Sequence, residues 1–376
     1  MFQRAQRFWF RVSNGMALGE LWKQFEADAR LSYRLFSQEV DTTRKPGTRK
    51  GRHFLRTVRL FFWAIVDKLT PARRILLLAA LIMMAINFDI RWDSGHHAGT
   101  GFYVGPISLS GWGELLVLLV LILEVTDRVV MKRDLQIAKE IQNWLLPPSP
   151  PAVPGLEIAF LTKPANTVAG DYYDVFPRPG VSGKSGTYLI AIADVAGKSI
   201  PAAMLMATYQ ASLKTLAARA ETLTDLASAM NNYACGNSDN GRRFTTTFIA
   251  EYEAGARQLT YVNAGHNPPM LMRKNGSIER LTEGGIPLGI LEGAQYESGV
   301  TRIESGDWLA IFTDGATEAE NTAEQEYSEA RLVQVLYANA TATPQVALSA
   351  IMMDINRFVG AAPQHDDITL MLIRAI

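Results

Sequence analysis

Four aspartates in this 376-residue chain are placed where a β-sheet could bring their carboxylates together. Each adjoins a short run that is typical of a strand, and the four are Asp171, Asp194, Asp314 and Asp366. Any one of them alone would more often be a turn residue, because Asp-Gly and Gly-Asp pairs are common in turns. If the strand ends converge, however, the carboxylates repel one another unless a cation neutralises them.

The ligand chemistry indicates which cation this would be. Carboxylate oxygens are hard ligands that favour Mg²⁺ or Mn²⁺ over zinc, and Cys235 is the only cysteine of the chain. Two such ions about 3.5–4 Å apart can acidify a bridging water and bind a phosphoryl oxygen. We find no Ser-His-Asp nucleophile elbow and no phosphate-binding P-loop. The residues alone therefore predict a divalent-metal phosphoryl enzyme without naming its substrate.

The elements that must position these aspartates lie in residues 150–376. Apolar runs predict strands at 156–163, 187–193, 244–253, 258–264, 270–273, 278–281, 307–312 and 368–373. Helical patterns occupy 200–219, 223–233, 330–338 and 344–359. Strands joined by short turns, with helices in separate blocks, predict an α+β domain with antiparallel sheets.

The N-terminal part differs in charge. Residues 1–74 carry 16 Lys/Arg against 6 Asp/Glu, which predicts a basic cytoplasmic region over 1–72. Apolar segments at 75–86 and 115–123 predict a two-helix transmembrane hairpin over 73–130, with the surrounding cations on the cytoplasmic side. Each segment reaches the roughly 20 residues of a membrane span only with its polar flanks, so a buried hairpin in a soluble domain stays an alternative. The first interpretation places the protein in the cytoplasmic (inner) membrane with its catalytic domain in the cytoplasm.

A linker helix is predicted in the segment 124–147, where the helical pattern runs from Glu124 to Leu146 and Pro147 and Pro148 end it. One side carries the apolar stripe Val130, Ile137, Ile141 and Trp144. An apolar stripe on a helix between two units favours pairing with a second copy, which predicts a homodimer.

Six ordered motifs follow this helix, which itself contains the run Leu135–Gln142. They are Ala169-Gly-Asp-Tyr-Tyr-Asp-Val175, Asp194-Val-Ala-Gly-Lys-Ser199, Tyr261-Val-Asn-Ala-Gly-His-Asn-Pro-Pro269, Pro287-Leu-Gly289, Thr313-Asp-Gly-Ala-Thr-Glu318 and His365-Asp-Asp-Ile-Thr369. Together they cover about residues 135–376, and the chain resembles the SpoIIE/RsbU-type branch of the PPM (protein phosphatase 2C-like) family.

The resemblance implies an α-β-β-α sandwich and hydrolysis of phosphoserine or phosphothreonine by a water activated by two ions, Mn²⁺ or Mg²⁺. It implies that Asp194 bridges both ions and that Asp314 and Asp366 complete the first site. The second site would use Asp171 and the main-chain carbonyl of Val195. It also implies a phosphorylated regulatory protein as substrate, an anti-sigma-factor antagonist of the STAS class, under control of the preceding helix.

Some positions depart from the family pattern. The histidine that the eukaryotic branch offers as a general acid is replaced by Ala196, and Lys198 is a weak candidate for that role. We expect His266 to organise a turn, and Asp174 and Asp367 to support the site rather than bind metal.

Two other functions compete with the phosphatase. A catalytically silent scaffold of the same fold could bind a partner without turnover. A nucleotide cyclase is suggested by the Gly-Asp-Tyr-Tyr loop, but no nucleotide-binding motif accompanies it. We expect no nucleic-acid partner.

Overall fold

The computed structural model describes residues 69–93, 109–178, 186–237 and 243–376, although not the side chains of 86–93, 109 and 110. The chain divides into two units, Met1–Arg128 and Val129–Ile376. The basic region predicted at 1–72 lies almost wholly outside the described residues, as does the loop at 94–108.

The first unit contains helix α4 (Pro71–Asp93) and the beginning of helix α5 (Leu109–Leu145). The two helices approach closely at Gly113, where an added Cβ would lie 2.8 Å from the carbonyl oxygen of Ala80. Ion pairs at the other end of the contact join Arg73 to Glu124 (3.1 Å) and to Asp127 (2.6 Å). The two predicted helices therefore pack against each other.

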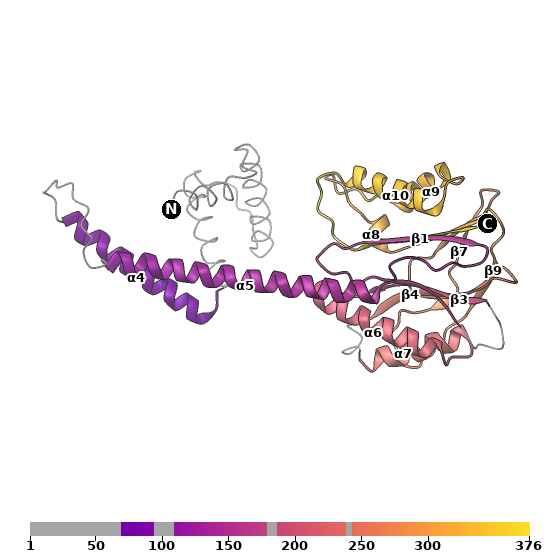
Figure 1. Ribbon diagram of the computed structural model, residues 1–376, viewed down its shortest axis with the longest axis horizontal. Helices are drawn as coiled ribbons and strands as arrows, with labels where there is room; N and C mark the ends of the chain where they lie inside the picture. The colour runs from indigo at the N-terminus through magenta and orange to yellow at the C-terminus, as the bar shows by residue number, and fades with distance from the viewer. Residues whose placement is uncertain (1–68, 94–108, 179–185, 238–242) are drawn as a thin grey trace, which may run out of the picture. The chain divides into compact units, whose positions relative to one another are not determined.

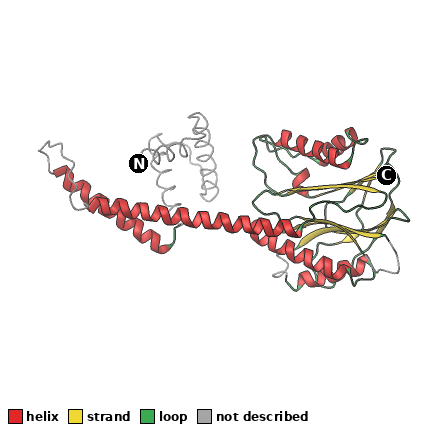
Figure 2. Ribbon diagram, viewed as in Figure 1, coloured by secondary structure: helices red, strands yellow, loops and turns green. Residues whose placement is uncertain are grey.

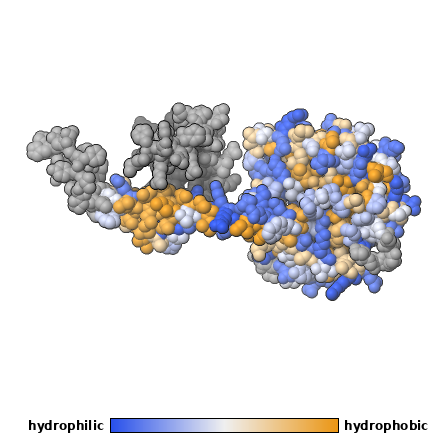
Figure 3. Space-filling model, in the orientation of Figure 1, coloured by the Kyte–Doolittle hydropathy of each residue, from blue (hydrophilic) through white to orange (hydrophobic). Residues whose placement is uncertain are grey.

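The surface of this helix pair is strongly apolar. Figure 3 shows it as a continuous hydrophobic patch, to which Ile75, Leu78, Leu118, Leu121 and Ile122 contribute exposed side chains. Within the described residues, however, no helix has a stretch long and apolar enough to cross a bilayer. The transmembrane character predicted for residues 73–130 stays a prediction.

In the second unit, the described strands form two sheets that lie face to face (Figure 2). The first has the order β1 (Leu156–Lys163), β11 (Ile368–Ala375), β10 (Trp308–Phe312), β6 (Met270–Met272), β7 (Ile278–Arg280). The second has the order β2 (Tyr172–Pro177), β3 (Thr187–Val195), β4 (Thr245–Glu253), β5 (Gln258–Ala264), β8 (Gly284–Gly285), and β9 (Gly299–Arg302) also pairs with β5. All pairings are antiparallel except the two-residue contact of β5 with β8.

Helices cover the outer faces of both sheets (Figure 1). The first sheet packs against α9 (Glu329–Ala338) and α10 (Pro344–Val359), and the second against α6 (Ser199–Ala217) and α7 (Leu223–Cys235). One apolar cluster fills the space between the sheets and under α6 and α7, and a second lies under α9 and α10. The α-β-β-α sandwich expected for residues 150–376 is confirmed.

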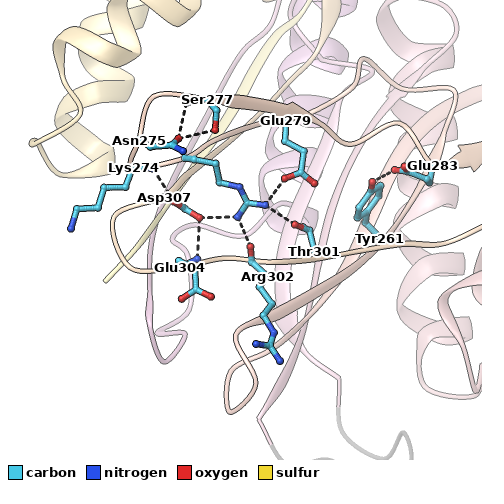
Figure 4. A network of polar contacts seen from close by, with 11 residues as sticks. Tyr261, Lys274, Asn275, Ser277, Glu279, Glu283, Thr301, Arg302, Glu304 and Asp307 are labelled. Carbon is cyan, nitrogen blue, oxygen red and sulfur yellow. Dashed lines mark hydrogen bonds and ion pairs between the residues drawn. The ribbon is translucent and has the colours of Figure 1, made fainter.

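The sheets are also joined at the end of β10 that lies away from the predicted site (Figure 4). Asp307 is buried there and accepts hydrogen bonds from Arg273 Nη1 (2.9 Å) and from two backbone amides. Arg273 comes from the first sheet and also donates to Thr301 Oγ1 (2.9 Å) on β9 of the second sheet. This polar contact ties the two layers together far from Asp314, which follows the other end of β10.

Candidate active site

Strand register brings the predicted aspartates together in two pairs. Tyr172 of β2 lies opposite Ala193 of β3, so Asp171 and Asp194 are neighbours at one end of the second sheet. Phe312 of β10 lies opposite Leu370 of β11, so Asp314 and Asp366 flank one end of the first sheet. Antiparallel pairing therefore converts four sites far apart in sequence into two adjacent pairs.

The electrostatics show that these pairs share one cluster. The pKa of Asp171 is raised well above its ordinary value, first by burial and then by the charge of Asp194. Burial, followed by the charges of Asp314 and Asp366, raises the pKa of Asp194 to about 7. Burial also raises the pKa of Asp314, with the charge of Asp366 adding to it. Carboxylates that destabilise one another in this way need a counter-charge to be ionised together.

Hydroxyl groups hold the most buried member of the cluster. Thr313 Oγ1 donates to Asp171 Oδ2 at 3.0 Å and accepts from the backbone N–H of Thr369 at 3.0 Å. The Thr369 hydroxyl is in turn 2.8 Å from that of Thr162 on β1. Thr313 and Thr369 fix the carboxylate of Asp171 against the ends of the central strands β10 and β11.

Sequence reasoning missed this threonine support. The signal was present, because Thr313 directly precedes Asp314 in one motif and Thr369 closes another. Their proximity to Asp171 depends on contacts between distant parts of the chain, which neither motif contains.

Asp366 lies at the exposed side of the cluster, next to a cation. Lys198 Nζ is 3.1 Å from Asp366 Oδ2 and also donates to the carbonyl oxygen of His365 at 2.6 Å. Both side chains are about half exposed, at 53% for Lys198 and 46% for Asp366. The lysine therefore neutralises part of the cluster while staying in contact with solvent.

The two aspartates expected to support the site do so through polar contacts. Both oxygens of Asp367 accept backbone amides, from Ala165 at 2.7 Å and from Gly170 at 2.6 Å. Asp174 is buried and pairs with Lys214 Nζ at 2.5 Å and the hydroxyl of Tyr172 at 2.8 Å. Asp367 thus fixes the segment that leads into Asp171, and Asp174 joins β2 to α6.

The main-chain ligand expected at Val195 also lies close to Asp171. A Cβ added to Gly170 would be 3.2 Å from the carbonyl oxygen of Val195, so the two segments are nearly in contact. Nevertheless, no three His, Cys, Asp or Glu side chains in the described part of the chain are grouped so that they could hold one metal ion. The carboxylates share a charged cluster without being gathered around a single point.

His266 is buried behind the cluster in the turn that follows β5. Its Nδ1 is 3.2 Å from the hydroxyl of Thr246, the residue paired with Asp194 across the sheet. Its backbone N–H donates to Asn263 Oδ1 at 2.7 Å, which closes the turn as expected. Burial lowers the pKa of His266 to about 4, although the backbone of Phe312 opposes this, so the ring is neutral at pH 7.

A cavity of about 280 Å³ opens beside Asp366. Its titratable lining residues are Lys163, Glu318, Glu320, Glu326, His365 and Asp366. The cavity leaves room for a further chemical group next to the exposed side of the cluster.

Comparison with protein families gives one match that covers about half of the chain. The profile of the family described as "Stage II sporulation protein E (SpoIIE)" matches residues 184–376. This range includes Asp194, Asp314 and Asp366, whereas Asp171 precedes it.

Two of the proteins similar to this chain are bacterial. Protein IcfG of Synechocystis sp. is 28% identical over an alignment of 279 residues that covers 66% of this chain and 42% of IcfG. Phosphoserine phosphatase RsbU of Bacillus subtilis is 29% identical over 246 residues, which are 65% of this chain and 70% of RsbU. The chain therefore spans less than half of IcfG.

Solved structures resemble the second unit. The SiaA-PP2C domain of Pseudomonas aeruginosa superposes with a TM-score of 0.54 at 18% identity, covering 66% of this chain and 99% of that domain. A structure of the PP2C phosphatase domain of SpoIIE from Bacillus subtilis, with a fragment of its regulatory domain, gives 0.51 at 16% identity, covering 60% of this chain and 63% of that structure. Both similarities indicate the same fold.

Proposed function

The chain belongs to the SpoIIE family, of the SpoIIE/RsbU type within the PPM serine/threonine phosphatases, and from this premise we propose that it hydrolyses phosphoserine or phosphothreonine on a regulatory protein. The observation that carries the proposal is the shared cluster of Asp171, Asp194, Asp314 and Asp366. Because these carboxylates are buried and repel one another, a bound cation would stabilise their ionised forms.

The donor set suits Mn²⁺ or Mg²⁺ because it consists of carboxylate oxygens. The charge of Asp194 acts on Asp171 of its own pair, and the charges of Asp314 and Asp366 of the other pair act on Asp194. Asp194 would therefore contact both ions, with Asp314 and Asp366 on one side. Asp171 and the carbonyl of Val195 would lie on the other. Bound divalent ions would supply a nucleophilic water at neutral pH and charge for the phosphoryl oxygens.

Neighbouring residues of the chain would hold the carboxylates in position. Thr313 aims the carboxylate of Asp171, and Asp367 holds the backbone that leads into it. The half-exposed Asp366 leaves the cluster open to a phosphoryl group from solvent, next to the cavity. Fixed charges at the reacting group would stabilise the transition state more than the ground state.

We propose a phosphorylated anti-sigma-factor antagonist of the STAS class as the substrate. RsbU, one of the relatives, is named a phosphoserine phosphatase, which supports phosphoserine as the reacting group. A panel of STAS-type phosphoproteins from the same genome would test the choice. Faster hydrolysis of an unrelated phosphopeptide than of every panel member would contradict it.

The activity itself is tested with the purified full-length chain and p-nitrophenyl phosphate in the presence of Mn²⁺. We expect turnover that Asp194→Ala abolishes and that chelation by EDTA removes. Asp134→Ala, which deletes an exposed carboxylate on α5, is the matched control and should leave the rate unchanged. A folded wild-type chain without turnover under these conditions would overturn the proposal.

One observation favours the alternative function, a catalytically silent scaffold. No three His, Cys, Asp or Glu side chains among the described residues are grouped around one point. Binding of Mn²⁺ in a calorimeter, without hydrolysis of any phosphopeptide, would favour the scaffold. Turnover would exclude it.

Dimer formation through α5 is also part of the proposal. The stripe residues Val130, Ile137, Ile141 and Trp144 are all exposed, with Trp144 exposed to 81%. Sedimentation of the full-length chain should therefore show a dimer that Trp144→Glu and Ile137→Glu together dissociate. A monomeric wild-type chain would contradict this.

We propose attachment to the cytoplasmic membrane through 73–130, with the catalytic domain in the cytoplasm. The apolar patch on α4 and α5 supports attachment, although the described helices do not meet the length and apolarity of a span. Fractionation of cells that express the chain would test it. Recovery of all of the protein in the soluble fraction would reject the attachment.

A further inference from the structure

The cavity of about 280 Å³ beside Asp366 has no part in the hydrolysis described above. It lies in the second unit and is lined by α10, by the segment that follows β10 and by the loop that precedes β11. Gly315, which follows Asp314, and Asp366 itself belong to its lining. A group that enters the cavity is therefore close to the place where the phosphate of a substrate would react.

One wall of the cavity is apolar. It is formed by Ile355 and Val359 of α10, together with Ala319, Pro363 and Ile368. Ile355 and Ile368 are buried members of the apolar cluster under α9 and α10, so this wall is a fixed part of the domain. A hydrocarbon chain that lay against it would be removed from water, which favours its binding.

The opposite wall carries negative charge. Glu318, Glu320 and Glu326 line the cavity from the segment between α8 (Asp314–Thr317) and α9. Burial raises the pKa of Glu318, and the charges of Asp314, Glu326 and Asp366 add to this effect. The glutamates are therefore close enough to repel one another, and a cation between them would relieve the repulsion.

The cations that line or border the cavity are engaged elsewhere. Lys163 Nζ donates to Asn356 Oδ1 at 2.8 Å, and Lys198 Nζ contacts Asp366 and the backbone. Glu320 lies 3.9 Å from His365 Nε2. Among the described residues, neither Glu318 nor Glu326 forms an ion pair. An apolar wall thus faces two carboxylates that no cation of the described chain neutralises.

We propose that this cavity is a specificity pocket for the side chain of an arginine close to the phosphoserine of the substrate protein. The inference rests on the proposed function, in which the phosphate binds at the carboxylate cluster. The hydrocarbon part of the arginine lies against Ile355 and Ile368, and its guanidinium group lies between Glu318 and Glu326. Phosphate and arginine then occupy neighbouring sites on the two sides of Asp366.

Arginine fits this cavity better than the two other cations that could enter it. Its planar guanidinium group has five donors and can bind two carboxylates at once, whereas lysine offers a compact point charge. A divalent ion prefers oxygen ligands on all sides, and the apolar wall offers it none. The combination of wall and charge therefore favours a long side chain with a guanidinium end.

The experiment uses the full-length chain with Mn²⁺ and short phosphoserine peptides. Arginine is placed in turn at each of the three positions before and after the phosphoserine. Each peptide has a twin with citrulline, which keeps the shape of arginine without its charge, and a second twin with lysine. We measure kcat/KM for every peptide. Calorimetry measures the affinity of the same peptides with serine in place of phosphoserine, so that the pocket is tested without turnover.

At one position, or at two neighbouring ones, arginine should raise kcat/KM about tenfold over citrulline, and lysine should raise it less. The same order should appear in the calorimetric affinities. The advantage of arginine should decrease with added salt, because the glutamates are in contact with solvent.

Glu318→Gln and Glu326→Gln together should reduce the preference for arginine over citrulline to less than about twofold. Glu324→Gln is the matched control, because it removes an exposed carboxylate of the same segment that does not line the cavity. This variant should keep the preference of the wild type.

The half-saturating Mn²⁺ concentration, measured with the citrulline peptide, separates the pocket from a further metal site. It should be the same within about twofold in the wild type and in the double variant. A rise of tenfold or more would assign the cavity to a metal ion and overturn the inference.

Equal kcat/KM for arginine and citrulline at every position would overturn the inference, as would a preference that survives the double substitution. Loss of the preference in Glu324→Gln would contradict it as well. The proposed function fails separately, if the wild-type chain hydrolyses none of the phosphopeptides. Calorimetry then decides alone: a tenfold higher affinity for an arginine peptide, lost in the double variant, would support the pocket, and equal affinities would overturn it.

Discussion

The hydroxyl of Thr313 donates a 3.0 Å hydrogen bond to Asp171, and this bond joins the two pairs of aspartates. Thr313 directly follows β10 and precedes Asp314, whereas Asp171 directly precedes β2 in the other sheet. The bond therefore ties the two sheets together at the site and orients the most buried carboxylate.

Thr313→Val keeps the shape of this side chain but removes its donor. The hydrogen bond lowers the pKa of Asp171, so its loss should make the carboxylate harder to ionise and to offer to a cation. We expect the half-saturating Mn²⁺ concentration to rise about fivefold to twentyfold in the phosphatase assay. Thr313→Ser, which keeps the hydroxyl, should stay near wild type, and equal effects of both variants would contradict the role of the bond.

Asp194→Asn should stabilise the metal-free chain although it removes the activity. The folded-state pKa of about 7 lies above the ordinary 3.8, so the folded state holds the proton more tightly than the unfolded state. The protonated Asp194 therefore adds to the free energy of unfolding at low pH, and this contribution is lost as the pH rises through about 7. At pH 8 the neutral asparagine avoids this cost, which we place at about 1–3 kcal/mol after allowing for partial exposure.

Urea unfolding in EDTA at pH 8 measures this difference, with Asp134→Asn as a control at an exposed position. Saturating Mn²⁺ should reverse the order, because only the wild-type site would gain from the ion. A metal-free wild type more stable than Asp194→Asn would show that the carboxylates do not repel one another as described.

Much of this arrangement could be predicted from local patterns. The apolar run at 156–163 predicted the bounds of β1 residue for residue, and Asp194, Asp314 and Asp366 were recognisable because each adjoins an apolar run. Short elements were missed: β8 and β9 have two and four residues and contain no apolar run. A strand of that length is specified by its neighbours rather than by its own sequence.

The support of the site could not be predicted because it depends on contacts between distant segments. Gln142 is one of several polar residues on α5, and only the folded chain shows that Ala169 lies against it. Gly315 is another case, since an added Cβ would lie 2.1 Å from the carbonyl oxygen of Asp367. Ser199 adopts a φ of 66°, in the left-handed region that favours glycine. A serine at this position gives no sequence signal for that conformation.

His266 should give the stability of the domain a specific pH dependence. Its folded-state pKa of about 4 lies below the ordinary 6.5, so the unfolded chain takes up the proton first as the pH falls. Stability from the neutral ring is therefore complete above pH 6.5 and is lost progressively toward pH 4. The loss should be on the order of 3 kcal/mol, from about 1.4 kcal/mol per pKa unit.

Urea unfolding of wild type and His266→Gln at pH 7, 5.5 and 4 isolates this contribution. The unfolding free energy of wild type minus that of His266→Gln should decrease as the pH falls, whatever its sign at pH 7. A constant difference over this range would show that His266 titrates normally in the folded chain.

Lys198 can be tested as a general acid by comparing leaving groups. Its Nζ contacts Asp366 and the carbonyl oxygen of His365, which indicates charge neutralisation rather than proton donation. Lys198→Met should therefore slow a phosphoserine peptide and p-nitrophenyl phosphate by the same factor, below about tenfold. A general acid would instead matter for the serine alkoxide and hardly for nitrophenolate, which leaves without a proton. A fall in kcat of about 10²-fold or more on the phosphoserine peptide alone would identify Lys198 as the general acid, because general acids contribute about that much. Lys198→Arg, which keeps the charge but cannot give up a proton, should retain nearly full activity on both substrates.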